Sequence, residues 1–151
     1  MVDDPPHWWT IQRHAKGYEG HVLVAGLGLG LIVHALVQNP KVTGITVVEL
    51  EPDVISLVKP HVPSCNIVQA DWYEYEPDFK VGGVFYDLFV GDGRALLPMA
   101  IGEMVRLRRR FPGVLHRILG FHNEMLTRHA IEIEEAQAAG IQWLLKQQKS
   151  E

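Results

Sequence analysis

Residues 21–33 read His-Val-Leu-Val-Ala-Gly-Leu-Gly-Leu-Gly-Leu-Ile-Val. The apolar, β-branched start of this stretch predicts a buried strand, and the apolar residues after the last glycine predict a helix. Between them stand Gly26, Gly28 and Gly30. Glycine allows a tight turn and lets a ligand approach the backbone without a Cβ in the way. The stretch therefore predicts a ligand-binding turn, or alternatively a turn that needs glycine for its geometry alone.

The spacing of these glycines restricts the class of ligand. A dinucleotide-binding fingerprint places its third glycine one position later, where this chain has Leu31. A phosphate-binding loop requires Lys-Ser or Lys-Thr after its glycines, and neither pair follows here. The spacing of the glycines thus argues against NAD and ATP as the ligand.

Apolar runs and helical patterns alternate along the rest of the chain, which indicates a parallel sheet covered by helices. The strands are expected at 21–25, 44–50, 66–69, 83–90 and 114–121, and the helices at 29–38, 52–59, 95–111 and 124–149. Right-handed crossovers then predict an α/β, doubly wound, Rossmann-like sheet of five strands in the order 3-2-1-4-5. Residues 21–151 are predicted to form one nucleoside-binding domain, preceded by an arm at 1–20 that is extended or a short helix.

Composition narrows the class of protein and its partners. The chain has 151 residues, of which 47% are hydrophobic and 21% charged, and a formal net charge of -4. No overall cationic field attracts nucleic acid, so no nucleic-acid partner is expected. The longest apolar run, 22–36, contains three glycines and His34, so no membrane segment is expected. A single cysteine, Cys65, and no leader pattern favour a cytoplasmic location.

The second predicted strand ends in acid about 20 residues after the glycines. A carboxylate at that edge can accept both hydroxyls of a ribose, which is the role expected of Glu49 with Leu50 beside it. Glu51 and Asp53 follow at the start of a helix, where negative charge favours the helix dipole. The alternative for Glu49 is a solvated charge at the end of a strand.

An acid and an aromatic residue, Asp71 and Trp72, follow the third predicted strand. Asp71 is expected to accept a hydrogen bond from an adenine amino group, with Trp72 against the ring. Alternatively, Asp71 caps a local turn and Trp72 packs in the core.

The fourth predicted strand closes on Asp92, which stands between two glycines. Its carboxylate would project from the carboxyl edge near the switch between strands one and four, where doubly wound sheets bind ligands. There it can orient or deprotonate an acceptor. The alternative is a turn aspartate that bonds only to local backbone.

Taken in this order, these elements resemble the class I S-adenosylmethionine-dependent methyltransferase superfamily over about residues 21–122, and the spermidine-synthase-like branch looks similar in particular. The similarity to that branch lies in Val24, where most methyltransferases have an acid, in Val48-Glu49, and in Tyr86, Asp87 and Asp92. The resemblance implies contacts of Gly26, Gly28 and Gly30 with the methionine part of S-adenosylmethionine, of Glu49 with the ribose, of Asp71 with the adenine and of Asp92 with the reacting group.

The chain departs from the branch at three places. Leu29 stands where spermidine synthases place an aspartate inside the glycine turn, and Gly93-Arg94 stand where further acids would grip a polyamine. The terminal strand hairpin of the methyltransferase fold is apparently missing, because residues 127–149 read as helix. A strand edge left unpaired there suggests a homodimer.

Four residues are candidates for the acceptor side of the site. Trp8 and Trp9 form an aromatic lid or else pack the arm onto the sheet, and Arg94 and His122 follow strands four and five. The eight histidines show no tight metal-ligand spacing, so no metal is expected. The arginines at 106–110 are interpreted as a solvated helix end.

The sequence therefore predicts an S-adenosylmethionine-dependent methyltransferase that acts on a small-molecule acceptor. Two alternatives remain open. One is an aminopropyltransferase like spermidine synthase, and the other is a non-catalytic module that binds S-adenosylmethionine and serves in assembly.

Overall fold

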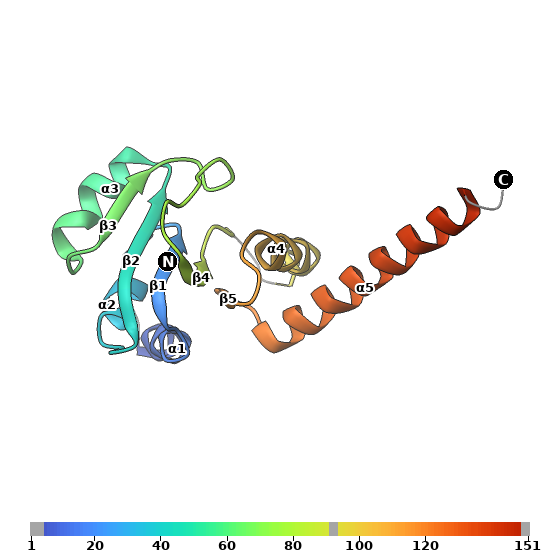
Figure 1. Ribbon diagram of the computed structural model, residues 1–151. Coiled ribbons are helices and arrows are strands. Elements are labelled where there is room, and N and C mark those ends of the chain that lie inside the picture. Colours follow the sequence, from blue (N-terminus) through green and yellow to red (C-terminus); the bar gives the residue numbers. More distant parts are fainter. Residues whose placement is uncertain (1–4, 91–93, 149–151) are drawn as a thin grey trace.

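A five-stranded parallel sheet forms the centre of the computed structural model, which describes residues 5–90 and 94–148 (Figure 1). The strands are β1 (Gly20–Ala25), β2 (Val42–Glu49), β3 (Asn66–Gln69), β4 (Val81–Tyr86) and β5 (Leu115–Ile118). Their order is β3-β2-β1-β4-β5, and all four pairings are parallel. The predicted fold class and strand order are confirmed.

Helices cover both faces of this sheet. They are α1 (Pro5–Ala15), α2 (Leu31–Leu36), α3 (Pro52–Val58), the short 3-10 helix η1 (Lys59–His61), α4 (Leu97–Arg110) and α5 (Asn123–Gln148). One buried cluster joins the sheet to α1 and α2, with α3 packed against it, and a second joins it to α4 and the start of α5. The result is a three-layer arrangement, as expected of a doubly wound sheet.

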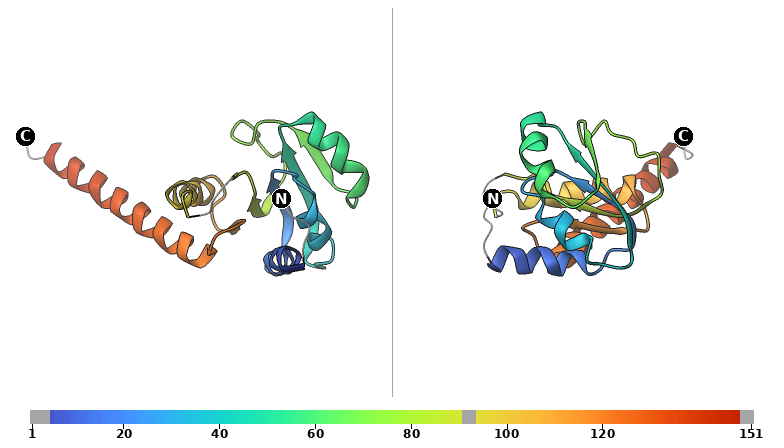
Figure 2. Two further views of the ribbon diagram at one scale, coloured as in Figure 1. Left: turned by 180° about the vertical axis from the view of Figure 1, so that it is seen from behind. Right: turned by 90° about the vertical axis from the view of Figure 1, so that its left-hand side faces the viewer.

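The C-terminal half of helix α5 extends away from the sheet and the other helices (Figures 1 and 2). Its first half packs on α4, where Arg108 pairs with Glu134 of α5 at 3.1 Å. Leu126 and Ala130 are fully buried against the second cluster, whereas Ile141, Trp143 and Leu145 are more than half exposed. Among the described residues, no helix is long and apolar enough to cross a membrane.

The N-terminal segment is helical and contributes to the core. Ile11 and Ala15 of α1 are buried, and so is Tyr18, whose hydroxyl donates a 2.7 Å hydrogen bond to the carbonyl oxygen of Val84 in β4. The Arg117 guanidinium of β5 donates to the carbonyl oxygens of Arg13 and His14. It therefore satisfies acceptors that the end of α1 leaves unpaired.

Strand β4 ends at Tyr86, four residues before the predicted end. The amide of Asp87 still donates to the carbonyl oxygen of Ala25 at 2.9 Å, but β1 ends there and turns away at Gly26. A strand without a neighbour has no partner for its backbone groups. The prediction of a strand to Val90 was therefore wrong at its carboxyl end.

The outer edge of β5 is closed at one point by a side chain. The amide of Ile118 donates to Asn123 Oδ1 at 2.7 Å, and Asn123 Nδ2 donates to the carbonyl oxygen of Ile118 at 3.2 Å. Asn123 thus imitates a paired strand residue and protects part of the open edge. A homodimer formed through this edge stays a prediction. Asn123 leaves fewer unpaired backbone groups on β5 for a second copy of the chain to bind.

Burial holds His14 neutral in the folded chain. Its ring lies 5.9 Å from the ring of Phe85, and burial, with the charges of Arg117 and Arg13, lowers its pKa to about 4. The unfolded chain takes up this proton near pH 6.5, so stability contributed by neutral His14 is present above that pH and is lost as pH falls towards 4. We expect a loss on the order of 1–2 kcal/mol over this range, because His14 keeps some solvent contact.

Urea denaturation of the wild type and of His14→Gln at pH 7 and pH 5 measures this contribution. The free energy of unfolding should fall more in the wild type than in the variant. Burial also lowers the pKa of His21 and His116, but both residues remain in the variant and cancel in the comparison. Equal losses in the two proteins would contradict the assignment.

Candidate functional site

The carboxyl ends of β1, β2 and β4 bring the predicted binding elements into one row. The amide of Gly26 donates to the carbonyl oxygen of Val48 at 2.9 Å, and the amide of Asp87 donates to that of Ala25 at 2.9 Å. Because the strands are parallel and in this register, Gly26 lies between the last residue of β2, Glu49, and Asp87. This edge at the switch between β1 and β4 is where doubly wound sheets bind ligands.

The three glycines of the turn all adopt positive φ angles, of 90° for Gly26, 50° for Gly28 and 72° for Gly30. A Cβ on Gly26 would lie 2.5 Å from the carbonyl oxygen of Asp87, and one on Gly30 would lie 2.1 Å from Val62 Cγ1. Glycine is therefore required at both positions by the chain itself. The part of the turn that is open to a ligand is its apex, where Gly28 is half-buried and Leu29 exposed.

Backbone hydrogen bonds hold Glu49 against this turn. Its Oε2 accepts the amide of Leu27 at 2.9 Å, and its Oε1 accepts the amide of Glu51 at 2.9 Å. Glu49 is therefore not a freely solvated charge at the end of a strand. Each carboxylate oxygen has capacity for a second hydrogen bond, so the group can still accept hydroxyl donors. Leu50, beside it, is 56% exposed.

Asp71 and Trp72 fit the alternative given for them, in which Asp71 caps a local turn and Trp72 packs in the core. Asp71 Oδ1 accepts the amide of Tyr73 at 2.8 Å, which caps the turn after β3. Trp72 is 4% exposed and packs edge-on against Tyr86, with ring centres 6.2 Å apart. Asp71 follows β3 at the carboxyl edge next to β2, since the amide of Ala70 donates to the carbonyl oxygen of Glu49 at 3.1 Å.

Asp87 is a carboxylate at this edge to which the sequence interpretation gave no role of its own. It is half-buried, and burial raises its pKa, as does the negative charge of Glu49, while His7 of α1 lowers it. The predicted catalytic Asp92 lies outside the described residues. The sequence singled out the Tyr86-Asp87 pair. Because the fourth strand was predicted to continue to residue 90, however, Asp87 was not recognised as the residue that follows the end of β4.

The residues predicted for the acceptor side come from three separate segments of the chain. Trp8 packs against the buried cluster that joins the sheet to α1 and α2, whereas Trp9 is 65% exposed. Arg94 is exposed just before α4. His122 lines a hollow of about 870 Å³ between α1, β5 and α5, together with Arg117. A role of these four residues on the acceptor side stays a prediction.

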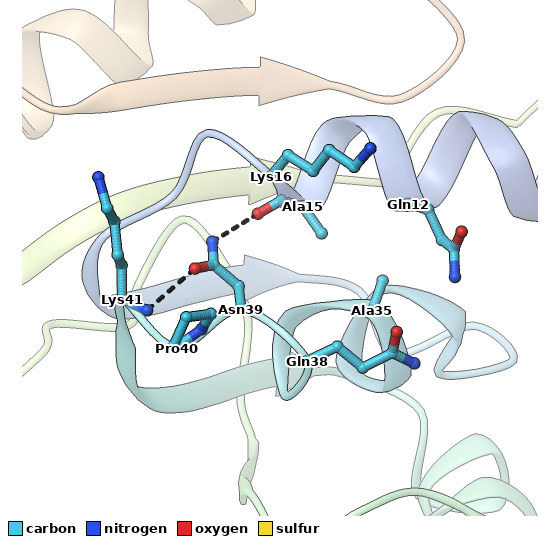
Figure 3. Close-up of a pocket in the computed structure, with 8 residues that line it drawn as sticks. All are labelled: Gln12, Ala15, Lys16, Ala35, Gln38, Asn39, Pro40 and Lys41. Atoms are coloured by element: carbon cyan, nitrogen blue, oxygen red, sulfur yellow. Dashed lines mark hydrogen bonds between the residues drawn. The ribbon is translucent and has the colours of Figure 1, made fainter.

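Figure 3 shows a second hollow, of about 390 Å³, at the opposite end of the sheet. Asn39 lies at its centre and donates from Nδ2 to the carbonyl oxygen of Ala15 at 2.9 Å, while its Oδ1 accepts the amide of Lys41. These bonds join the end of α1 to the start of β2. None of the predicted site residues lines this hollow, so it belongs to the scaffold. Within residues 5–90 and 94–148, no group of three or more His, Cys, Asp or Glu side chains could hold a metal ion.

Comparison with known proteins identifies the fold. No protein-family model matches the sequence, and no curated protein sequence matches it. Among solved structures, DesVI of Streptomyces venezuelae superposes with a TM-score of 0.55 at 12% identity, over 76% of this chain and 51% of that one. The 23S rRNA methyltransferase ErmE superposes with a TM-score of 0.50 at 19% identity, over 78% and 46%.

The chain thus spans about half the length of these two structures. At such identities the likeness concerns the fold alone. It is an α/β Rossmann-like methyltransferase fold with a five-stranded parallel sheet of order 3-2-1-4-5.

Proposed function

We propose that this chain binds S-adenosylmethionine at the carboxyl edge of β1 and β2 and supports methyl transfer to a small-molecule acceptor. The observation that carries the proposal is the Glu49 carboxylate, which two backbone amides fix beside the glycine turn. A fixed anionic acceptor next to an exposed backbone turn suits a ribose with two hydroxyl donors, because the protein need not reorganise to bind it.

The residues present fit this group part by part. Gly28 and Leu29 at the apex of the turn offer backbone to the methionine part of the ligand, and Glu49 offers its carboxylate to the ribose. Leu50 is exposed beside Glu49 and would cover a face of the adenine. The free oxygen of Asp71 would accept the adenine amino group, while Trp72 supports this segment from the core.

When bound, S-adenosylmethionine supplies a methyl group on a positively charged sulfur, which is already activated for displacement. The chain then has to align the acceptor with that carbon and to accept a proton where the acceptor carries one. Asp92 is the residue we propose for the proton, on the strength of its position after β4 in the sequence. The acceptor is a small molecule of unidentified structure.

Titration calorimetry with S-adenosylmethionine, S-adenosylhomocysteine and NAD tests the proposal. The two sulfur nucleosides should each bind with one site per chain, and NAD should not bind. Binding of NAD alone, or of none of the three, would contradict the proposed function.

Two further measurements on the same protein distinguish the alternative functions from the proposed one. An aminopropyltransferase should bind decarboxylated S-adenosylmethionine more tightly than S-adenosylmethionine. The second alternative is a non-catalytic module that binds S-adenosylmethionine. Such a module would bind the nucleosides without releasing S-adenosylhomocysteine when amines, hydroxyl compounds and sugars are offered as acceptors.

A further inference from the structure

We propose that the projecting end of α5, residues 138–148, pairs antiparallel with α5 of a second copy of this chain and covers the hollow along that copy's β5. The inference is independent of the proposed function. It places the contact between the two copies on a helix face, and not on the backbone edge of β5, which Asn123 partly closes.

Helix α5 continues past the helix that covers its first half. That helix, α4, ends at Arg110, and Arg109 near its end donates to the side chain of Gln137. Residues 138–148 extend about three turns and 16 Å beyond this level, and those whose burial the structure describes are exposed (Figures 1 and 2). Lys146 is the only charged residue among them. A helix segment with so little charge is normally covered.

One face of α5 connects this projecting end with the hollow along β5. Ile131, Ala138 and Leu145 are spaced by seven residues, or two turns, so they lie in one row along the helix. Ile131 lines the hollow, and so does Glu124, seven residues before it. The fully buried Ala130 lies about 100° around the helix from Ile131. The row therefore lies beside the packed face of α5 and runs from the hollow to the end of the helix.

This row is complementary to itself. Contacts around a two-fold axis are the same for both copies. Ala138 stands midway between Ile131 and Leu145, so antiparallel helices that cross at Ala138 bring Ile131 of each copy against Leu145 of the other. Alanine at the crossing lets the two helices approach closely. Ile131 and Leu145, which are 37% and 52% exposed in the single chain, then cover each other.

The charges on α5 favour the antiparallel direction. Residues 123–135 contain four glutamates, whereas residues 136–148 contain no acid and one lysine. Parallel helices would set the glutamates of the two copies side by side. Antiparallel helices place the acid-free half of each copy against the acidic half of the other, and their dipoles also oppose each other.

The hollow has charged groups that suit the end of the incoming helix. The last carbonyl oxygens of a helix have no partner within it and carry partial negative charge. Arg13 and Arg128 line the hollow and can donate to such oxygens, while Glu124 and Glu132, which also line it, suit Lys146 of the second copy. A membrane surface fits this end of α5 less well, because one cation on a chain of net charge -4 gives little attraction to anionic lipid.

Sedimentation of the wild type and of two variants over a concentration series tests the contact. The wild type should sediment as a dimer. Leu145→Glu should weaken the association about 100-fold or more, because the new carboxylate is buried against Ile131 without a partner. Trp143→Gln is the matched control, since Trp143 is equally exposed but lies roughly 200° around the helix from Leu145, and it should leave the association unchanged.

A disulfide tests the direction of the two helices. Ala138→Cys and Gln142→Cys are each made with Cys65→Ser and oxidised with oxidised glutathione. Only Ala138→Cys should give a covalent dimer, because the two copies of residue 142 lie about 12 Å apart along an antiparallel pair, beyond the reach of a disulfide. Parallel helices would give a covalent dimer with both variants.

Three outcomes would overturn the inference. One is a monomeric wild type, including one that binds phosphatidylglycerol vesicles through α5. Another is a dimer that Leu145→Glu leaves intact, which would place the contact elsewhere. The third is equal cross-linking of Ala138→Cys and Gln142→Cys. None of these results bears on the binding of S-adenosylmethionine, which calorimetry tests separately.

Discussion

Replacing Glu49 by alanine is expected to weaken the binding of S-adenosylmethionine by about 1.5–3 kcal/mol, which is roughly 10- to 100-fold in affinity. The variant loses the acceptor for the ribose hydroxyls. It also leaves the amides of Leu27 and Glu51 without the carboxylate that they bond to at 2.9 Å. The glycine turn therefore loses its attachment to β2, and the loss in affinity should come with a lower melting temperature.

Glu51→Ala is the matched control for this experiment. It removes an exposed carboxylate two residues away but keeps the backbone amide that donates to Glu49. Its affinity should match that of the wild type, and its melting temperature should fall much less than that of Glu49→Ala, since Glu51 contributes only a charge near the start of α3 and no side-chain cap hydrogen bond. An unchanged affinity in Glu49→Ala would contradict the ribose assignment, and equal losses in both variants would indicate a general effect of charge.

Replacing Gly30 by alanine is expected to lower the free energy of unfolding by about 2–4 kcal/mol. Two costs add. The residue has a φ of 72°, which costs an L side chain about 1–2 kcal/mol. The new Cβ would also lie 2.1 Å from Val62 Cγ1, so the segment before β3 has to move. Urea denaturation gives the difference directly.

A double variant separates these two costs. Val62→Ala removes the clashing methyl group, so Gly30→Ala should cost about 1–2 kcal/mol in that background, the part due to φ. Gly113→Ala supplies the same measurement without a clash, because Gly113 has a φ of 77° and open space around its Cβ position. Equal costs of Gly30→Ala with and without Val62 would show that the turn is not packed as described.

The sheet and its order could be predicted because each strand is a short apolar run next to a helix of clear pattern. The ends of the elements could not, and β4 is the example. Its sequence stays apolar to Val90, yet the strand stops at Tyr86, where β1 turns away. A strand end depends on the neighbour in the sheet, which no local pattern contains.

The candidate site, like the fold, could be predicted only in part. Glu49 could be identified because an acid at the end of the second strand stands out from a buried run, but its two backbone partners follow only from the fold. Trp72 could not be assigned, since an aromatic residue after a strand suits a ligand and a core equally well. In the fold it packs on Tyr86. Asp87 could be placed at this edge only once the fold showed that β4 ends at Tyr86.

The most direct test of the central claim is the location of S-adenosylhomocysteine on the folded chain. In a ¹⁵N-labelled sample titrated with this nucleoside, the amide signals of Leu27, Glu51 and Asp87 should shift together and saturate with one affinity, because all three belong to the edge around Glu49. Shifts confined to the hollow along β5, at Arg117 and His122, or no shifts at saturating ligand, would contradict the claim that this edge is the binding site.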